Sequence, residues 1–509
     1  MICILLNHSF VNEVQTVAQL FFPNEGLTFD HIDMDEYPQG YVIKTAITVD
    51  AASAYVIKDA GIVANYTLSL NALPIHLSPR RVLMLALYHA LQKAVGAYTP
   101  WGALTGIRPS KMVREWLESG WSDEKIISTL ADPFCCTSEK AGLALSVARA
   151  ESELTRRIYN IATPIKPFRK AGVAIPLSKG VTEACRASFG RGINMFPPTP
   201  VGIYVSIPFC PTRCVYCSFN VAHNFASPDI HAQYVTAVAQ ECKSQAKRLA
   251  QMGGVVSSIY IGGGTPTSLS EKLLEQLLDA FGSAFGINSG IEYSVEAGRP
   301  DTLTKHKLDI LRKYGANRIA VNPQTLNDQT LSVIGRKHTA ADFFRAFALA
   351  RDAGFECINT DIIVGLPGET PDDVCRTMEG IASLSPENIT VHTLAIKRAS
   401  RLNALRNDYA LPGIEDTETM LNIANATCVN TGLRPYYMYR QKNMVGMFEN
   451  VGYSKPGHEC LYNVGMMAET QTVLGIGAGA VSKFVEDGKI SREFNVKNPE
   501  IYVERSIDT

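Results

Sequence analysis

The chain has 509 residues, of which 46% are hydrophobic and 19% are charged, and its formal net charge is −1. These values are typical of a globular protein of two or three domains, and the near-neutral charge gives no sign of a nucleic-acid partner. Its 12 cysteines are too dispersed for the disulfide framework of a small secreted domain, so we expect reduced thiols and a cytoplasmic location.

Residues 1–157 are predicted to form a separate α+β domain, with strands at 41–48, 54–58 and 64–70 followed by helices. The first ten residues lack the basic lead and cleavage site of a signal peptide. The apolar stretch 82–98 contains His89, Gln92 and Lys93 at helical spacing, which favours an amphipathic helix over a membrane span.

The most distinctive part of this domain is the 101–109 segment, Trp-Gly-Ala-Leu-Thr-Gly-Ile-Arg-Pro. It is interpreted either as a loop and helix start that docks on the next domain or as a substrate contact. Residues 158–200, which are rich in Pro, Gly, Lys and Arg, are predicted to be a linker.

From residue 201 to 404, apolar strand-like runs alternate with longer helical periods, as expected of βα units around a parallel sheet. Ser268 with Glu271 is predicted to cap one helix, and Asp301 to cap the next. Polar residues and glycines fall at the carboxyl ends of the strands, where barrel enzymes place their active sites. An open six-stranded βα barrel is therefore the predicted fold. Its strands are expected at 201–207, 256–261, 291–296, 318–322, 358–364 and 389–396.

Three cysteines, Cys210, Cys214 and Cys217, lie within eight residues directly after the first barrel strand. Three thiolates on one short loop can hold three irons of a 4Fe-4S cluster and leave the fourth iron open, which suits chelation by S-adenosylmethionine. A zinc site would need a further ligand, and His223 is the nearby histidine. Core packing alone is a weaker explanation for three cysteines at this spacing.

A glycine run, Gly262 to Gly264, follows the second barrel strand and is followed by Thr265 and a proline. Without side chains, its backbone can approach the amine of S-adenosylmethionine closely, although a plain strand-to-helix turn also uses glycine. Glu296 and Asp361, at later strands, are short carboxylates that can accept hydrogen bonds from ribose hydroxyls or can instead cap helices.

Residues 405–509 form a C-terminal region. Its tyrosine run at 436–439 predicts a half-buried strand, and its glycine run at 475–480 predicts a tight turn with close backbone approach. A lone glycine run of this kind is weak evidence for a nucleotide site.

Five motifs in this order resemble the radical S-adenosylmethionine family of oxygen-independent coproporphyrinogen III oxidase, also called coproporphyrinogen dehydrogenase. The resemblance covers about residues 200–485 and implies a partial (β/α)6 radical SAM barrel. Together with the 101–109 segment and the long N-terminal domain, it is strongest to the HemZ-type branch. The motifs are the cysteine loop, the Gly-Gly-Gly-Thr-Pro-Thr run, Val-Glu-Ala at 295–297, Gly-Arg-Lys-His at 335–338 and the run 361–370.

By this resemblance, Cys210, Cys214 and Cys217 hold the 4Fe-4S cluster. In the oxidase proper, the positions that contact S-adenosylmethionine divide between two bound molecules. The matching residues of this chain are Tyr204, Tyr216, Gly263, Gly264, Thr265, Glu296, Gln324, Arg336, Asp361 and Ala395. The chain departs from the family at Ser206, where related branches have histidine, and at Phe219, where the oxidase proper has a fourth cysteine that is not a cluster ligand.

The implied reaction is oxidative decarboxylation of coproporphyrinogen III to protoporphyrinogen IX in porphyrin and haem biosynthesis. A 5′-deoxyadenosyl radical takes a hydrogen from a propionate, which then loses carbon dioxide and an electron to leave a vinyl group. The implied partners are the tetrapyrrole substrate and an electron donor such as flavodoxin or ferredoxin. Arg299, Arg440 and Lys442 are candidates for pairing substrate carboxylates, or are solvated surface charges.

Two other functions stay open. One is a haem chaperone that resembles the enzyme, in which His458 or Cys460 ligates haem iron. The other is an anaerobic haem-degrading radical S-adenosylmethionine methyltransferase, which would transfer a methyl group from a second S-adenosylmethionine.

Overall fold

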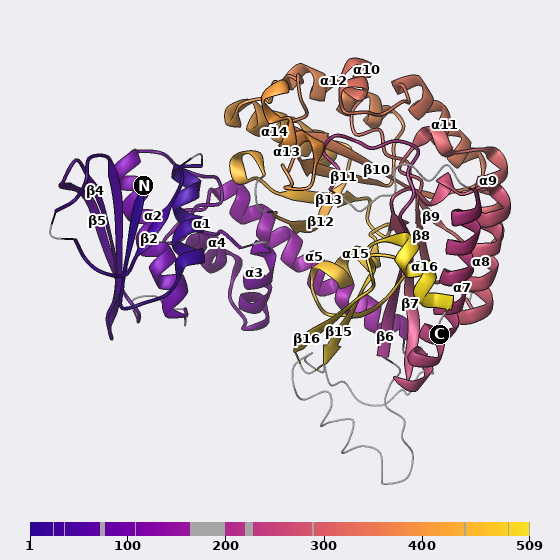
Figure 1. Cartoon of the computed structure of the whole chain (residues 1–509), viewed down its shortest axis with the longest axis horizontal. Coiled ribbons are helices and arrows are strands. Elements are labelled where there is room, and N and C mark those ends of the chain that lie inside the picture. The colour runs from indigo at the N-terminus through magenta and orange to yellow at the C-terminus, as the bar shows by residue number, and fades with distance from the viewer. Residues whose placement is uncertain are drawn as a thin grey trace, which may run out of the picture. The chain divides into compact units, whose positions relative to one another are not determined.

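The computed structural model in Figure 1 divides into two compact units. The N-terminal unit comprises Met1–Ala148 and Tyr439–Glu449, and the barrel unit comprises Arg149–Met438 and Asn450–Thr509. The predicted domain boundaries at 157, 200 and 404 stay predictions. The structure describes all residues except 24, 35, 72–76, 107, 163–198, 219–227, 288–289, 442–443, 487 and 508–509. Most of the predicted linker, Phe219, His223 and Lys442 therefore lie outside the described residues.

The N-terminal unit contains a five-stranded sheet with the order β2-β1-β3-β4-β5, and helix α2 packs on β4 and β5. The three predicted strands are confirmed as β3, β4 and β5. The sequence prediction missed β1, whose residues Cys3, Ile4 and Leu5 are buried in the core. The elements are β1 Ile2–Leu6, α1 Val11–Phe21, β2 Thr28–Asp30, β3 Tyr41–Ile47, β4 Ala51–Lys58, β5 Gly61–Ser69, α2 Pro79–Val95, α3 Pro109–Glu118, α4 Asp123–Ala131 and α5 Ser138–Ala162.

The segment Tyr439–Glu449 returns from the C-terminal region to complete this unit. Glu449 is fully buried, accepts a hydrogen bond from the indole Nε1 of Trp101 at 2.7 Å and lies 2.7 Å from Nζ of Lys140. The Arg440 guanidinium lies 5.6 Å from the Trp101 ring. Trp101, the first residue of the 101–109 segment, is therefore a buried structural residue of the N-terminal unit.

The barrel unit confirms the predicted open βα barrel. Strands β6 to β11 lie side by side in sequence order, and each pairs in parallel with the next. Helices α7, α8, α9 and α11 lie along the outside of the curved sheet (Figure 1). The bounds are β6 Thr199–Ile207, α7 Pro228–Gln251, β7 Gly254–Gly263, α8 Glu271–Phe285, β8 Glu292–Glu296, α9 Lys305–Lys313, β9 Arg318–Ala320, α10 Asp328–Val333, α11 Ala340–Asp352, β10 Cys357–Val364, α12 Pro371–Ser383 and β11 Asn388–Thr393.

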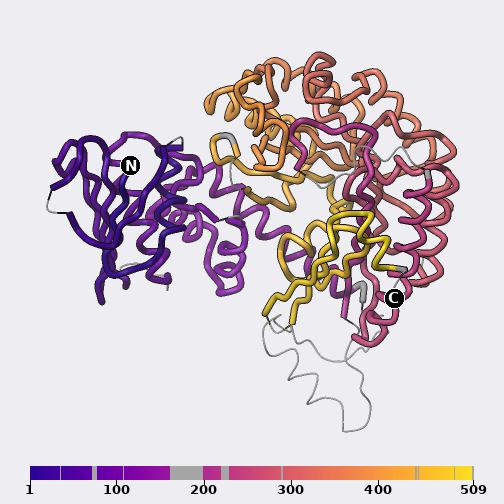
Figure 2. The backbone as a smooth tube through the Cα atoms, in the orientation of Figure 1, coloured from indigo at the N-terminus to yellow at the C-terminus, as the bar shows by residue number. Residues whose placement is uncertain are grey.

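The C-terminal region extends the barrel sheet on both sides. Strand β13 pairs antiparallel with β11, whereas β14 pairs in parallel with β6, and Figure 2 shows this late segment running beside the first barrel strand. The predicted tyrosine strand is confirmed as β12. The remaining elements are α13 Arg401–Ala404, α14 Ile414–Asn430, β12 Arg434–Tyr439, β13 Asn450–Ser454, α15 Leu461–Met467, β14 Thr472–Ile476, β15 Val481–Glu486, β16 Lys489–Phe494 and α16 Pro499–Ile507.

Two predicted helix caps are wrong for the same physical reason. Each loop first makes a short 3-10 turn that begins at a proline, η1 Pro266–Ser268 and η2 Pro300–Thr302, so the cap of the following helix lies further along the chain than predicted. Ser270 caps α8 in place of Ser268, and Thr304 caps α9 in place of Asp301.

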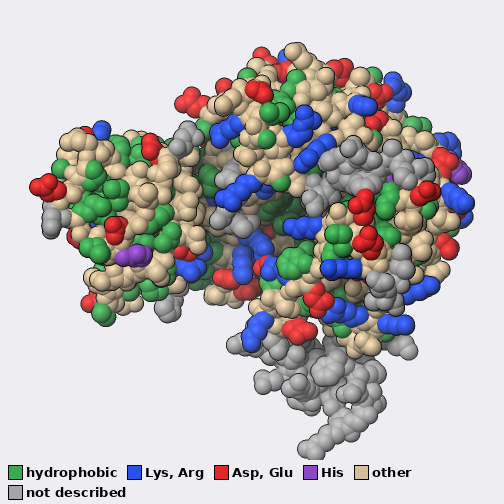
Figure 3. All heavy atoms as spheres, in the orientation of Figure 1, with side chains coloured by type: hydrophobic (Ala, Val, Ile, Leu, Met, Phe, Trp, Pro, Cys, Tyr) green, Lys and Arg blue, Asp and Glu red, His purple; other side chains and the backbone are tan. Residues whose placement is uncertain are grey.

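Basic and acidic side chains are interspersed over the face of the barrel unit that Figure 3 shows, as the small net charge predicts. Among the helices that the structure describes, none is long and apolar enough to cross a membrane. All eleven cysteines within the described ranges are free thiols.

Candidate functional site

The cysteine loop leaves β6 and folds directly against the glycine run. The backbone amide of Gly264 donates to the carbonyl of Ile207 at 2.8 Å, and the backbone amide of Thr265 donates to the carbonyl of Phe209 at 2.7 Å. Sγ of Cys210 lies 3.3 Å from Oγ1 of Thr265. Two motifs that are far apart in the sequence thus meet at the carboxyl ends of neighbouring strands.

The far side of the cysteine loop is fixed by the loop that follows α10. Oγ1 of Thr212 donates to the carbonyl of Gly335 at 2.9 Å, and the amide of Cys217 donates to the carbonyl of Cys214 at 3.1 Å. The Gly-Arg-Lys-His motif at 335–338 therefore supports the loop that carries the thiols.

The donor set suits an iron-sulfur cluster, because the three thiols are presented by one loop held by backbone hydrogen bonds on both sides. Each thiolate of a 4Fe-4S cluster binds a different iron, so the three sulfurs need not converge on one point. Burial raises the pKa of the Cys210 thiol to about 11. In the absence of metal this thiol is protonated at neutral pH, and it must release its proton when iron binds.

The three glycines at the end of β7 are required by the fold itself. A Cβ at Gly262 would lie 2.9 Å from the carboxyl carbon of Glu296, and one at Gly264 would lie 2.6 Å from the carbonyl oxygen of Phe209. Gly263 adopts a φ of +102°, in the left-handed region that favours glycine. The run leaves a stretch of backbone without side chains beside the cysteine loop.

Glu296 ends β8 and accepts a hydrogen bond from the hydroxyl of Tyr260 at 2.7 Å. Burial, with a smaller contribution from the nearby charge of Asp361, raises the pKa of Glu296 to about 7. This carboxyl group therefore exchanges a proton near neutral pH, and it can either accept or donate a hydrogen bond there.

Asp361 lies in β10 and is held by polar neighbours. The amides of Asn322 and Asn359 donate to its two carboxylate oxygens at 2.8 and 2.7 Å, and Nε2 of His392 lies 3.8 Å away. Burial acts to raise the pKa of Asp361, but the hydrogen bonds and charge of His392 and the Asn359 amide outweigh it, and the pKa is lowered. Asp361 is thus the ionised carboxylate of the pair.

Asn322, Asn359 and His392 were not predicted as site residues. Asn359 precedes Asp361 by two positions on the same strand, and side chains two residues apart share one face of a strand. That alternation is the sequence signal that would have found it.

Gln324 contacts Asp361, Arg336 contacts Asn322, and both are mostly buried. Gln324 has a positive φ of 69°, and its backbone amide donates to the backbone carbonyl of Asp361 at 3.0 Å. Its side-chain oxygen has no hydrogen-bond partner among the described residues. Arg336 donates to the carbonyl of Asn322 at 2.6 Å and interacts with Cys214 and Tyr216. A buried acceptor without a partner fits a ligand with hydroxyl or amine donors.

Tyr204 belongs to a stack of three aromatic rings inside the barrel. Its ring centroid lies 6.4 Å from that of Tyr260 and 6.1 Å from that of Tyr462, and the latter two are 4.7 Å apart. Tyr216 packs on the apolar cluster around Leu394, and Ala395 directly follows that residue. The predicted S-adenosylmethionine residues therefore all lie at the carboxyl ends of the barrel strands or inside the barrel, and their individual ligand roles stay predictions.

Arg299 is wrong as a candidate for pairing substrate carboxylates, because it is only 2% exposed and is already engaged. It donates from Nη2 to Oγ1 of Thr212 at 2.7 Å, and its Nη1 lies 3.7 Å from Sγ of Cys214. Arg440 is also wrong, since it is buried in the N-terminal unit and donates to the carbonyl of Met447 at 2.6 Å. Lys442 lies outside the described residues.

Replacing Arg299 with glutamine is expected to make the cluster harder to reduce. A nearby cation and an N–H···S hydrogen bond favour the more negative, reduced state of an iron-sulfur cluster. The measurement is an anaerobic redox titration followed by electron paramagnetic resonance. Arg213→Gln is the control, because Arg213 carries the same charge within the cysteine loop but donates to the carbonyl of Ala399. An unchanged potential in a fully loaded Arg299→Gln protein would contradict this role.

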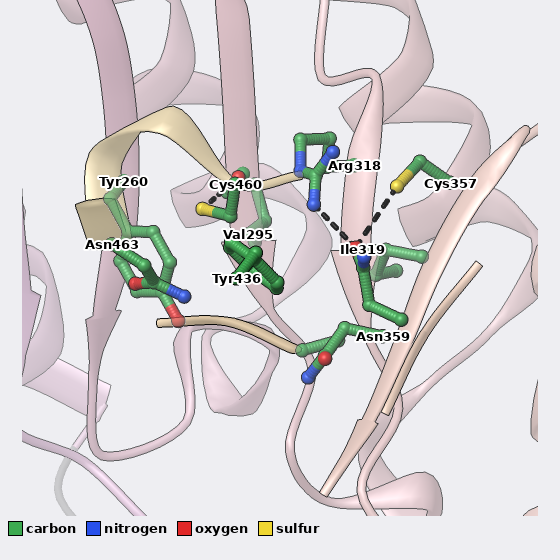
Figure 4. Close-up of a pocket in the computed structure, with 12 residues that line it drawn as sticks. Tyr260, Val295, Arg318, Ile319, Cys357, Asn359, Tyr436, Cys460 and Asn463 are labelled. Atoms are coloured by element: carbon green, nitrogen blue, oxygen red, sulfur yellow. Dashed lines mark hydrogen bonds between the residues drawn. The ribbon is translucent and has the colours of Figure 1, made fainter. Parts of the chain in front are cut away.

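A cavity inside the barrel reaches the amino ends of β9 and β10 (Figure 4). Arg318 begins β9 and Cys357 begins β10, and the cavity measures about 30 Å³, which has room for one or two water molecules. Cys460 lines it and donates to Oε1 of Glu292 at 3.4 Å, while burial raises the pKa of its thiol. The carbonyl of His458 accepts from Arg318 at 2.8 Å. Cys460 is thus part of the packing around this cavity, whereas His458 contributes its backbone carbonyl there and is only partly buried.

Comparisons with known proteins agree with this geometry. Residues 204–381 match the family model described as the radical SAM superfamily. The chain is 33% identical over 502 residues to the oxygen-independent coproporphyrinogen-III oxidase-like protein HemZ of Bacillus subtilis, covering 97% of this chain and 92% of HemZ. It is 33% identical over 280 residues to the heme chaperone HemW of the same organism, covering 54% of this chain and 69% of HemW.

Among solved structures, the chain resembles coproporphyrinogen III oxidase (HemN) of Escherichia coli, which is a radical SAM enzyme. The TM-score is 0.51 at 25% sequence identity, over 62% of this chain and 70% of that one.

Proposed function

Because the chain belongs to the radical SAM superfamily, in the group of oxygen-independent coproporphyrinogen-III oxidase-like proteins that includes HemZ, we propose that it decarboxylates coproporphyrinogen III. Its cofactors are a 4Fe-4S cluster and S-adenosylmethionine. The observation that carries the proposal is the similarity to HemZ over nearly the whole of both chains. A cytoplasmic site of action, with an electron donor of the flavodoxin or ferredoxin class, belongs to the same proposal.

In this proposal, Cys210, Cys214 and Cys217 hold the cluster. The bound cofactors supply a 5′-deoxyadenosyl radical. The backbone of the glycine run binds the methionine amine, and Asp361, whose pKa is lowered, accepts a hydrogen bond from a ribose hydroxyl. Glu296 stays close to half protonated at neutral pH, so a bound hydroxyl donor favours its ionised form.

The chemical balance of the proposed reaction is complete. Each propionate loses one hydrogen atom, one carbon dioxide and one electron, and becomes a vinyl group. The hydrogen atom goes to 5′-deoxyadenosine, and the electron goes to an external acceptor. Two such rounds convert the substrate to protoporphyrinogen IX and release two molecules of 5′-deoxyadenosine.

A heme chaperone is the second candidate, and the similarity to HemW supports it. That similarity spans 54% of this chain, whereas the similarity to HemZ spans 97% and so includes the N-terminal unit. The burial of Cys460 beside Glu292 also argues against its use as an axial haem ligand. Decarboxylation is therefore the better supported proposal.

The test is an anaerobic assay of the reconstituted protein with S-adenosylmethionine, a reductant and coproporphyrinogen III, followed by mass spectrometry. We expect loss of two carboxyl groups coupled to formation of 5′-deoxyadenosine. Deoxyadenosine without a decarboxylated product would refute the substrate and keep the radical chemistry. Stable haem binding without turnover would then identify a chaperone, and a methylated tetrapyrrole would identify a methyltransferase.

A further inference from the structure

The N-terminal unit contains a cavity of about 380 Å³, more than ten times the volume of the one inside the barrel. It lies where α2 and α3 begin, and Leu104, Gly106, Arg108 and Pro109 of the 101–109 segment form part of its lining. A cavity of this size is within the range of small-molecule sites. The decarboxylation proposal makes no use of this segment.

The cavity is electropositive. Arg81, Arg108 and Lys111 line it, and Glu115 is the acidic side chain in the lining, which leaves an excess of two positive charges. Nη1 of Arg81 lies 3.1 Å from Sδ of Met112, another lining residue, and this contact holds the guanidinium along the wall. The chain as a whole has a net charge of −1, so this positive excess is local.

Two helix N-termini add to the same potential. Ser78 precedes α2 and Arg108 precedes α3, both line the cavity, and neither makes a side-chain capping hydrogen bond. The N-terminus of a helix carries a partial positive charge and favours bound anions. Three cationic side chains and two helix ends therefore point to an anionic ligand.

The rest of the lining is apolar. Leu77, Leu104 and Trp116 are at least nine-tenths buried, and they form a hydrophobic wall beside the cations. A simple inorganic anion would have no use for this wall, whereas an apolar ring that carries carboxylates would contact both parts of the lining. Arginine is well suited to carboxylates because its planar group can donate two parallel hydrogen bonds.

We propose that this cavity binds an organic anion built from an apolar ring system with carboxylate arms. Porphyrins are members of this class, and the choice of a porphyrin as ligand rests on the proposed function. The N-terminal unit would then hold a second tetrapyrrole site, apart from the radical site in the barrel.

The test is a titration of the full-length protein with coproporphyrin III, the stable oxidised form of the proposed substrate, followed by quenching of tryptophan fluorescence. Arg81→Glu is the test variant. Its neighbour Arg80→Glu is the matched control, because Arg80 carries the same charge on the same helix but pairs with Glu13 and does not line the cavity. Reversal of the Arg81 charge should weaken binding about tenfold, as expected for a hydrogen bond to a charged group, and Lys111→Glu should act in the same direction.

Equal affinities in Arg81→Glu and Arg80→Glu would overturn the proposal. If pyrophosphate displaced coproporphyrin III as well as an equal concentration of a competing porphyrin did, the cavity would be a simple anion site, and the proposed recognition of an apolar ring would be overturned. The result is independent of the barrel reaction, since binding that depends on Arg81 in a protein without decarboxylase activity would sustain this site and refute the proposed function. Decarboxylase activity together with binding that does not depend on Arg81 would refute this site and sustain the proposed function.

Discussion

Replacement of Cys214 with alanine is expected to abolish formation of 5′-deoxyadenosine, even without a tetrapyrrole present. The cysteine loop offers three thiolates for three irons, so removal of one leaves an iron with no protein ligand. Loss of an outer-shell partner alone costs about 10- to 100-fold in metal affinity or activity, and loss of a direct ligand should exceed that. Cys214 is 8% exposed, so solvent has little room to replace its sulfur.

The measurement combines iron and sulfide analysis of the reconstituted protein with chromatography of 5′-deoxyadenosine under strong reductant. Cys375→Ala is the control, because Cys375 is a thiol on α12 that donates to Glu379 one turn away and takes no part in the loop. Cys375→Ala should keep the iron content and the activity of the unmodified protein. A Cys214→Ala protein that still cleaves S-adenosylmethionine would refute the role of the loop. This experiment tests the radical chemistry separately from the identity of the substrate.

The cysteine loop was predictable because its three sulfurs are close in sequence as well as in space. The six barrel strands were predictable because each is a run of buried residues bounded by turn signals, and their polar ends converge by the geometry of parallel sheets. Glu296 and Asp361 were proposed by that rule and by the family resemblance. The sequence did not indicate how differently the two carboxyl groups ionise. That difference depends on their burial and on polar neighbours such as His392, which reaches Asp361 from β11.

Arg299 shows the limit of reading charge from sequence. An arginine after a strand has the same local signal whether it faces solvent, a substrate or the protein. Here, Thr212 and Cys214 from a distant loop receive its hydrogen bonds, and the position of that loop is set by tertiary packing. Likewise, β1 was missed because its short apolar run is typical of several structures, and only pairing with β2 and β3 makes it an inner strand of the sheet.

Replacement of Glu449 with leucine is expected to destabilise the N-terminal unit by about 3–5 kcal/mol, the usual cost of breaking a buried ion pair by removing one partner. Its carboxylate is fully buried between Nζ of Lys140 and Nε1 of Trp101, each at 2.7 Å. Without Glu449, a lysine that is 1% exposed would lose its close counter-charge, and the indole would lose its acceptor.

Urea unfolding followed by tryptophan fluorescence measures this effect directly, because all three tryptophans, Trp101, Trp116 and Trp121, belong to the N-terminal unit. Glu139→Gln is the control, because Glu139 lies 3.8 Å from Lys140 but is 61% exposed, and exposed pairs contribute about 0–1 kcal/mol. An unchanged unfolding midpoint in Glu449→Leu would refute the expected role of the pair.

The double replacement Lys140→Met with Glu449→Leu separates the cost of leaving a buried lysine unpaired from the net contribution of the ion pair itself. It removes both charges together, so it should recover most of the stability that Glu449→Leu loses, because an apolar pair of similar volume avoids the desolvation penalty. Glu449 reaches this unit from a segment that follows the six strands β6 to β11 in sequence. A fragment of residues 1–148 would therefore carry Lys140 and Trp101 without their partner, and it should unfold at a lower urea concentration than the same unit in the full-length chain.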